Sequence, residues 1–279
     1  MRTDIVRILL KSPKFLFGLS IIAAIVLWIT VYPMIKSGDP KEMVAMAFQR
    51  PSDKLPLGSD NFGRNVVLEL AYGTRTSMFV GLLAGVIATS IGLVIGFSAG
   101  YLGGRVDNIL TAVTNMFIVI PSFIILILIS VSINTRSPLL LAAIIGLTSW
   151  PWTARAVRAQ SSSLRQRDHV NIARISGFGS MHIIVSEIFP YLASYVVMAF
   201  ILQTASGILQ EASISMLGLG PYNTVSLGIM MNWALLFEAP VAGAWWAFIP
   251  TALIIASITF SLFMMNSGMD EVFNPKIRS

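Results

Sequence analysis

Long hydrophobic runs without a charged residue follow one another along the chain. There are six, at residues 15–35, between Arg75 and Arg105, between Asp107 and Arg136, and at residues 137–154, 188–210 and 239–269. Each run has at least the roughly 17 residues that a helix needs to cross the hydrocarbon core of a bilayer. The pattern therefore predicts an all-α membrane protein with about six transmembrane helices.

The composition supports this class. Of the 279 residues, 55% are hydrophobic and only 11% are charged, whereas soluble domains carry roughly 25% charged residues. The net charge is +6, but the basic residues lie in short loops and form no stripe interleaved with aromatics. We therefore expect no nucleic-acid partner. Cysteine is absent, which excludes disulfides and thiolate zinc sites.

The basic residues also predict how the spans are oriented. With the N-terminus inside, twelve of the 19 Lys and Arg residues fall in inner segments: Arg2, Arg7, Lys11, Lys14, Arg105, Arg155, Arg158, Arg165, Arg167, Arg174, Lys276 and Arg278. Because basic residues concentrate in cytoplasmic loops, both termini are predicted to be cytoplasmic. Residues 5–10, ahead of the first run, are predicted to form a short amphipathic helix on the membrane surface.

Residues 212–237 are also charge-free and long enough for a seventh crossing. They contain residues that would break a lipid-exposed helix, namely Gly218, Gly220, Pro221, Asn223 and Gly228. We therefore predict an outer or re-entrant loop in this stretch.

The glycines and prolines inside the other runs predict details of helix packing. Four glycines recur at four-residue spacing in the second run, at Gly92, Gly96, Gly100 and Gly104. Such a stripe lets a neighbouring helix approach closely. Pro121, Pro151 and Pro250 are expected to kink or end helices, which membrane bundles tolerate.

The sequence contains no motif for enzymatic chemistry. It has neither a phosphate-binding G-x-x-x-x-G-K-[S/T] motif nor H-E-x-x-H, and its two histidines, His169 and His182, lie in one basic loop. No catalytic, cofactor-binding or metal-binding residue is therefore predicted.

An ion-coupled secondary transporter is the alternative class of function. Such carriers place ionisable residues within their spans, and here only Glu211, just past the fifth run, is a candidate. Glu211 either lies in a substrate path or makes a hydrogen bond between helices. Thr114 and Asn115 either line the same path or join helices.

The segment between the fourth and fifth runs carries a recognisable motif. Asn171–Gly177 reads N-I-A-R-I-S-G, and Pro190 follows thirteen residues later. This resembles the EAA loop of binding-protein-dependent permeases, whose Ala, Gly and Pro correspond to Ala173, Gly177 and Pro190. Asn171 stands where that motif has Glu, and Arg174 lies between the matching positions.

Four further motifs and a short C-terminal one narrow the resemblance to the C-type permease of dipeptide, oligopeptide and nickel importers, a family of ATP-binding-cassette (ABC) transporters. They are residues 57–65 (L-G-S-D-N-F-G-R-N), 72–77 (Y-G-T-R-T-S), 99–107 (A-G-Y-L-G-G-R-V-D), 211–220 (E-A-S-I-S-M-L-G-L-G) and 274–275 (N-P). Asn115 departs from that family, because an aspartate is common there.

The resemblance implies an importer in a prokaryotic inner membrane that works by alternating access. Its expected partners are a second related permease, two ATPase subunits that hold ATP and Mg²⁺, an extracytoplasmic solute-binding protein and membrane lipid. The solute would be a peptide, an oligosaccharide or nickel. This chain would need no cofactor and would be no enzyme.

The resemblance also implies a division of the chain. Residues 1–70 would form an N-terminal segment with the first span and an outer loop, and residues 71–279 a five-helix permease core. A cytoplasmic loop at about residues 161–190 would couple the core to the ATPase. Its expected coupling residues are Asn171, Ala173, Arg174, Gly177 and Pro190.

Overall fold

The computed structural model describes residues 12–133, 136–221 and 223–273. Within these residues the regular structure is helical, and only two isolated β-bridges occur, Met43–Arg64 and Ser59–Asn65. The prediction of an all-α protein is confirmed. The predicted amphipathic helix at residues 5–10 and the motif at residues 274–275 lie outside the described residues.

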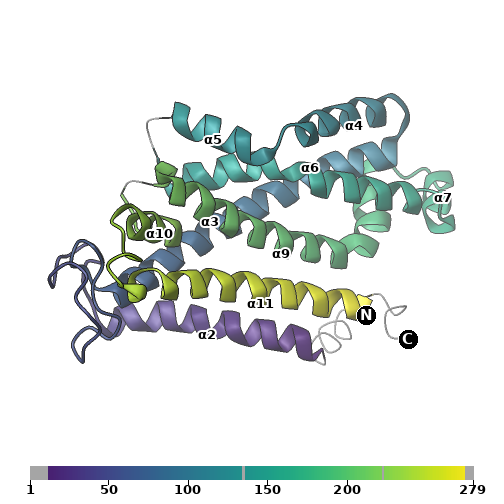
Figure 1. Ribbon diagram of the computed structural model, residues 1–279. Coiled ribbons are helices and arrows are strands. Elements are labelled where there is room, and N and C mark those ends of the chain that lie inside the picture. The colour runs from purple at the N-terminus through teal and green to yellow at the C-terminus, as the bar shows by residue number, and fades with distance from the viewer. Residues whose placement is uncertain (1–11, 134–135, 222, 274–279) are drawn as a thin grey trace.

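The helices run side by side along the length of the molecule in Figure 1. They are α2 (Pro13–Ile35), α3 (Val66–Phe97), α4 (Gly104–Val119), α5 (Ser122–Ser132), α6 (Pro138–Leu164), α7 (Asp168–Ile175), α8 (Ser180–His182), α9 (Phe189–Ile214), α10 (Leu227–Leu236) and α11 (Ile249–Phe273). Three π-helical turns, η1 (Ser98–Leu102), η2 (Ile183–Ile188) and η3 (Ser215–Leu219), and the 3₁₀ turn η4 (Trp245–Ala247) extend or join them.

Helices occupy all six predicted runs, but not all of them are equally apolar. Four helical stretches of the described chain are long and apolar enough to cross a membrane, and a fifth is if α4 and α5 count as one broken span. The remaining helix, α6, has 27 residues but carries Ser, Thr, Trp and Arg among its apolar residues. It packs along α3 and α9, so these residues meet protein as well as lipid.

The third predicted span is broken. α4 and α5 meet at an angle of 76°, and the break falls at Ile120 and Pro121. Proline has no N–H to donate and its ring blocks the preceding turn, which ends the helix there as the sequence predicted. The second span starts earlier than predicted, because α3 begins at Val66 rather than after Arg75 and therefore includes Glu69.

Close approach of α3 to α6 fixes the centre of the bundle. A Cβ atom on Gly92 would lie 2.6 Å from Thr153, and one on Gly96 would lie 2.7 Å from Val157. Gly100 likewise faces the α6 backbone, so the predicted packing stripe is confirmed at three positions. Gly104 is an exception, since it has a φ of +55° at the start of α4 and no atom near its Cβ position.

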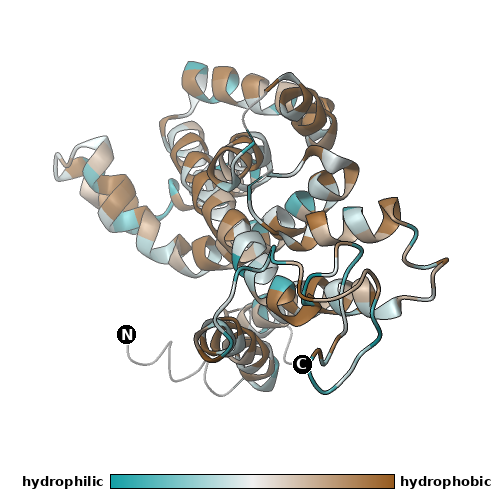
Figure 2. Cartoon of the chain, turned by 90° about the vertical axis from the view of Figure 1, so that its left-hand side faces the viewer, coloured by the Kyte–Doolittle hydropathy of each residue, from teal (hydrophilic) through white to brown (hydrophobic). Residues whose placement is uncertain are grey.

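The two ends of the bundle differ in character. The long loop 36–65 lies at one end, and α7 lies at the other end, where α2 starts and α11 ends (Figure 1). An ion pair between Lys14 and Glu271 at 3.2 Å joins those two helix ends. Seen from the loop end, the helices are largely hydrophobic and much of the hydrophilic colour follows the loops (Figure 2). We call these ends the loop end and the α7 end.

Residues 212–237 do not cross the membrane as a seventh span. α10 within them has only 10 residues, about half of what a crossing needs, so it is a short helix at the loop end.

Glu211 is the centre of a hydrogen-bond network that holds the start of α10. Its fully buried carboxylate accepts hydrogen bonds from Ser77 (2.6 Å) and Ser215 (2.7 Å). Ser77 in turn accepts the N–H of Leu227 at 3.1 Å. The network joins α3, α9 and the start of α10.

We expect this network to tolerate Glu211→Gln better than Glu211→Leu. An amide still offers an acceptor and a donor to the two rotatable hydroxyls, whereas leucine leaves both without their partner at a cost of about 1–3 kcal/mol. The measurement is thermal unfolding of the purified complex, with Ser213→Ala on an exposed face of α9 as the control. Equal melting temperatures for the two Glu211 variants would contradict this role.

Candidate functional site

A large cavity lies at the break between α4 and α5. Its volume is about 580 Å³, and its walls come from α4, α5, α6, α9 and one residue of α11. Pro121 at the break and Pro151 in the middle of α6 both line it. The apolar lining consists of Phe117, Ile118, Ile120, Pro121, Pro151, Trp152, Leu202, Leu209 and Phe263.

The polar lining of this cavity is uncharged throughout. It consists of Ser122, Thr148, Ser149, Gln203, Ser206 and Gln210, and none of the described lining residues is charged. Gln203 donates from Nε2 to the Ser149 carbonyl and to Thr153 Oγ1, both at 2.9 Å. Gln210 donates to Ser206 at 3.0 Å and to Ser149 Oγ at 3.2 Å. Both N–H groups of each amide are thus used within the protein, which leaves the two amide oxygens as acceptors. Gln210 Oε1 is buried without a hydrogen-bond partner in the described chain.

The sequence analysis did not single out these amide and hydroxyl groups. Gln203, Ser206 and Gln210 recur at three- and four-residue spacing within an apolar run, which places them on one face of α9. That spacing was a usable signal. The α6 residues that complete the cavity could not be found in this way, because their position depends on how the helices pack.

Thr114 and Asn115, two predicted path residues, line a smaller cavity of about 210 Å³ next to the first. It lies between α3, α4 and α6, closer to the α7 end. Asn115 Oδ1 accepts a hydrogen bond from Arg155 at 3.1 Å, and buried Thr114 donates to the Leu110 carbonyl of its own helix at 2.7 Å. Glu211, the third predicted path residue, lines neither cavity.

The predicted coupling residues gather around α7. Ala173 is buried beside Val170, and Asn171 is half-buried, while Arg174 and Gly177 are exposed. Arg174 lies with its guanidinium carbon 6.0 Å from the centre of the Tyr101 ring. The apolar residues exposed here, Ile172, Ile175, Phe178 and Met181, give the α7 end a surface suited to a protein partner.

Gly177 ends α7 in a conformation that glycine favours. Its φ is +84°, its N–H bonds to the Arg174 carbonyl at 3.1 Å, and the next N–H, of Phe178, bonds to the Ala173 carbonyl at 3.2 Å. This is the Schellman pattern. Within residues 161–190, α7 is the one separate short helix, because α8 runs on through η2 into α9. Pro190 lies in the first turn of α9.

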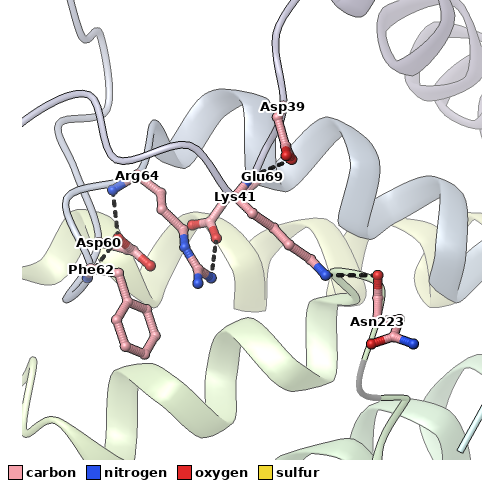
Figure 3. A network of polar contacts seen from close by, with 7 residues as sticks. All are labelled: Asp39, Lys41, Asp60, Phe62, Arg64, Glu69 and Asn223. Carbon is pink, nitrogen blue, oxygen red and sulfur yellow. Dashed lines mark hydrogen bonds and ion pairs between the residues drawn. The ribbon is translucent and has the colours of Figure 1, made fainter.

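The motif at residues 57–65 forms a fixed polar cluster at the loop end (Figure 3). Asp60 accepts the N–H groups of Phe62 (2.8 Å) and Arg64 (2.7 Å). The Arg64 guanidinium lies 4.4 Å from the Phe62 ring centre and 4.6 Å from that of Trp233, and it pairs with buried Glu69 at 3.5 Å. Burial raises the pKa of the Asp60 carboxyl, although the two N–H groups and the Arg64 charge act to lower it.

Further contacts hold the loop onto η4 and onto the segment that precedes α10. Lys41 donates to the Asn223 carbonyl at 2.7 Å (Figure 3), and Trp246 donates to the Ser59 carbonyl at 3.0 Å. Gly58 and Gly63 turn the chain with φ values of +63° and +76°. The sequence analysis recognised this motif by resemblance but did not predict what its residues contact.

Comparison with known proteins agrees with this architecture. Residues 92–279 match the model of the family described as binding-protein-dependent transport system inner membrane component. A putative peptide transport system permease protein of Brucella suis is 30% identical over 98% of this chain and 91% of its own length. The oligopeptide transport system permease protein OppC of Mycobacterium tuberculosis is 29% identical over 100% and 96%.

A third relative, the dipeptide transport system permease protein DppC of Bacillus subtilis, is 29% identical over 82% of this chain and 71% of its own length. The match to the family covers well over half of the 279 residues. The chain therefore belongs to the binding-protein-dependent transport system inner membrane components, as a permease of an ABC transporter that is not itself an ATPase.

Proposed function

We propose that this chain is one of two related permeases of a peptide importer in a prokaryotic inner membrane. Two ATPase subunits drive it, and an extracytoplasmic binding protein delivers the solute. The three relatives described above are named as peptide, oligopeptide or dipeptide permeases, which supports peptides over the oligosaccharide and nickel alternatives.

The main support for this proposal is the uncharged lining of the cavity at the α4–α5 break. An extended peptide brings unpaired N–H and C=O groups with it, and these lose free energy in an apolar passage unless they find partners. The Gln203 and Gln210 amide oxygens can accept peptide N–H groups, and the neighbouring hydroxyls can donate to peptide C=O groups, between apolar walls. Nickel would need imidazole, thiolate or carboxylate ligands, and none of the described lining residues supplies one.

Movement of this cavity would provide alternating access. Pro121 breaks the helix between α4 and α5, and Pro151 lies inside the continuous helix α6, where it removes one backbone hydrogen bond; both line the cavity. A helix break such as the one at Pro121 absorbs changes in backbone angle. α3, α6 and α9 form the rigid part, because glycines let them pack closely. The second permease would form the opposite wall.

α7 and the turn at Gly177 would receive the work of ATP hydrolysis. α7 packs against η2, which leads without a break into α9, and α9 carries Gln203 and Gln210. A displacement of α7 by the ATPase would therefore reach the cavity wall through one continuous stretch of helix. Asn171, Ala173, Arg174 and Pro190 would shape the same contact.

The orientation of the chain follows from its basic residues. We infer that the α7 end is cytoplasmic, with both termini, and that the loop end faces outward. We expect Cys at Ser52 and Asn223 to react with an impermeant thiol reagent in intact cells, and Cys at Ser163 not to react. The chain has no cysteine of its own, so each variant reports one site. Labelling at Ser163 would reverse the assignment.

Replacing an amide of the cavity should reduce transport without disturbing assembly. We expect Gln210→Leu to lower uptake of radiolabelled trialanine about tenfold, because roughly one hydrogen bond worth about 1 kcal/mol or slightly more is lost. Uptake is measured in proteoliposomes that contain all subunits and the binding protein. Gln160→Leu, on α6 and outside the cavity lining, is the control. Unchanged uptake by Gln210→Leu would argue against this cavity as the peptide path.

The coupling role of Gly177 has a closely matched control in Gly179. A Cβ atom would meet nothing within 4 Å at either position, but φ is +84° at Gly177 and −68° at Gly179. A β-branched residue at positive φ costs about 1 kcal/mol or more. We therefore expect Gly177→Val to displace the end of α7, whereas Gly179→Val keeps the native backbone.

The measurement is ATP hydrolysis by the reconstituted complex, with and without loaded binding protein, together with peptide uptake. Gly177→Val should assemble normally yet lose both stimulation and uptake, and Gly179→Val should keep both. Full uptake in Gly177→Val would mean that this turn does not couple the permease to its ATPase.

A further inference from the structure

The smaller cavity next to the proposed peptide path has an unusual set of charges. Its volume is about 210 Å³, and it is lined by Ile95 of α3, Ala99 of η1, Thr111, Thr114 and Asn115 of α4, and Ala154, Arg155 and Arg158 of α6. The larger cavity begins two residues further along α4, at Phe117, and two residues back along α6, at Trp152. The two cavities therefore follow one another between the same pair of helices.

One of its two arginines is neutralised within the chain. Arg158 makes a two-pronged ion pair with Asp107, in which its Nε bonds to one carboxylate oxygen and its Nη2 to the other at 2.7 Å. Thr111 donates to the same carboxylate at 2.9 Å, and Thr114 donates to a carbonyl of its own helix. These groups leave little hydrogen-bonding capacity for a ligand.

Arg155 is different. Its Nη2 donates to Asn115 Oδ1 at 3.1 Å, and within the described part of the chain it makes no ion pair. Asparagine accepts this bond without supplying a negative charge, so Arg155 keeps its full charge. A guanidinium has five N–H donors, and one of them meets Asn115. Because the Asn115 oxygen faces Arg155, its NH₂ group supplies two further donors.

We propose that Arg155 and Asn115 form a binding site for the carboxylate of the transported solute, on the side of the amide-lined cavity that faces α7. This site rests on the proposed function, because peptides carry a C-terminal carboxylate. A guanidinium binds a carboxylate through two parallel N–H···O bonds. The uncharged cavity thus receives the peptide backbone, and the neighbouring cavity receives its charged end.

Asn115→Asp is the sharpest variant to test the site, because it adds one negative charge and keeps the size of the side chain. The aspartate pairs with Arg155 and removes the net charge that would attract a solute carboxylate. Gln160→Glu makes the matching charge change on α6 outside both cavity linings, and it serves as the control.

The first measurement reads the charge of the cavity directly in the reconstituted complex. In a Thr111→Cys background, the rates of reaction with an anionic and a cationic methanethiosulfonate are compared. We expect the anionic-to-cationic ratio to fall about fivefold on adding Asn115→Asp, as one charge a few ångströms away requires in a partly aqueous site. Gln160→Glu should change it little. An unchanged ratio with Asn115→Asp would overturn the anion site.

The second measurement identifies the anion. Trialanine should slow the anionic reagent at the Thr111→Cys position, and trialanine amide, which lacks the carboxylate, should not. Equal protection by both would overturn the proposal. Protection that appears only in vesicles containing phosphatidylglycerol would assign the site to a lipid phosphate and would also overturn it.

Uptake measurements distinguish a failure of the carboxylate site from a failure of the proposed function. We expect Asn115→Asp to lower trialanine uptake severalfold while uptake of the amide stays near that of the unmodified complex. If the unmodified complex imports both peptides and Asn115→Asp changes neither, peptide import stands and the carboxylate site falls. If the unmodified complex imports neither peptide, the proposed function is contradicted, and the thiol-labelling rates still decide whether the cavity binds anions.

Discussion

The close packing of α3 against α6 and α9 is the interaction on which the rest of this permease depends. Gly92, Gly96 and Gly100 bring α3 against α6, and on another side of α3, Gly81 and Gly85 bring it against Thr204 and Ile208 of α9. Within lipid there is no water to drive helices together, so such close contact supplies much of their association. The three helices form a block to which the remaining ones are attached.

The irregular segments are attached where this block protects their backbone. A helix break exposes N–H and C=O groups that lipid cannot satisfy, so breaks occur where protein or a polar cavity surrounds them. The α4–α5 break opens onto the amide-lined cavity, and α10 is held through Ser77 and buried Glu211. The same requirement explains why the polar side chains of α6 and α9 gather at the cavity.

Arg64, Arg158 and Arg155 differ in whether an acid within the described fold neutralises their charge. Arg64 pairs with Glu69, and Arg158 pairs with Asp107, and both pairs join helices or loops. Arg155 faces a neutral asparagine instead, beside the passage that the solute is proposed to take. Ion pairs inside a bundle serve the fold, whereas an arginine without a carboxylate retains charge that a ligand can use.

The sequence by itself determined the helical class, the position of the runs that form the long helices, the glycine stripe and the helix end at Pro121. These depend on local composition, periodicity and backbone chemistry, which are properties of neighbouring residues. The predicted start of α3 lies too far along the chain, because Arg75 limits the apolar run although α3 includes both Glu69 and Arg75. The division at residue 70, the orientation and the coupling role of residues 171–190 stay predictions.

Tertiary structure alone decided which of the polar residues form a site. Asn115 and Arg155 are 40 residues apart, and Ser77 and Glu211 are 134 apart, and nothing local links the members of either pair. Asn115 and Glu211 looked alike in the sequence as polar residues in or beside apolar runs. Packing placed Asn115 at a cavity and Glu211 in the core, because helix contacts, and not hydropathy, determine which side chains meet.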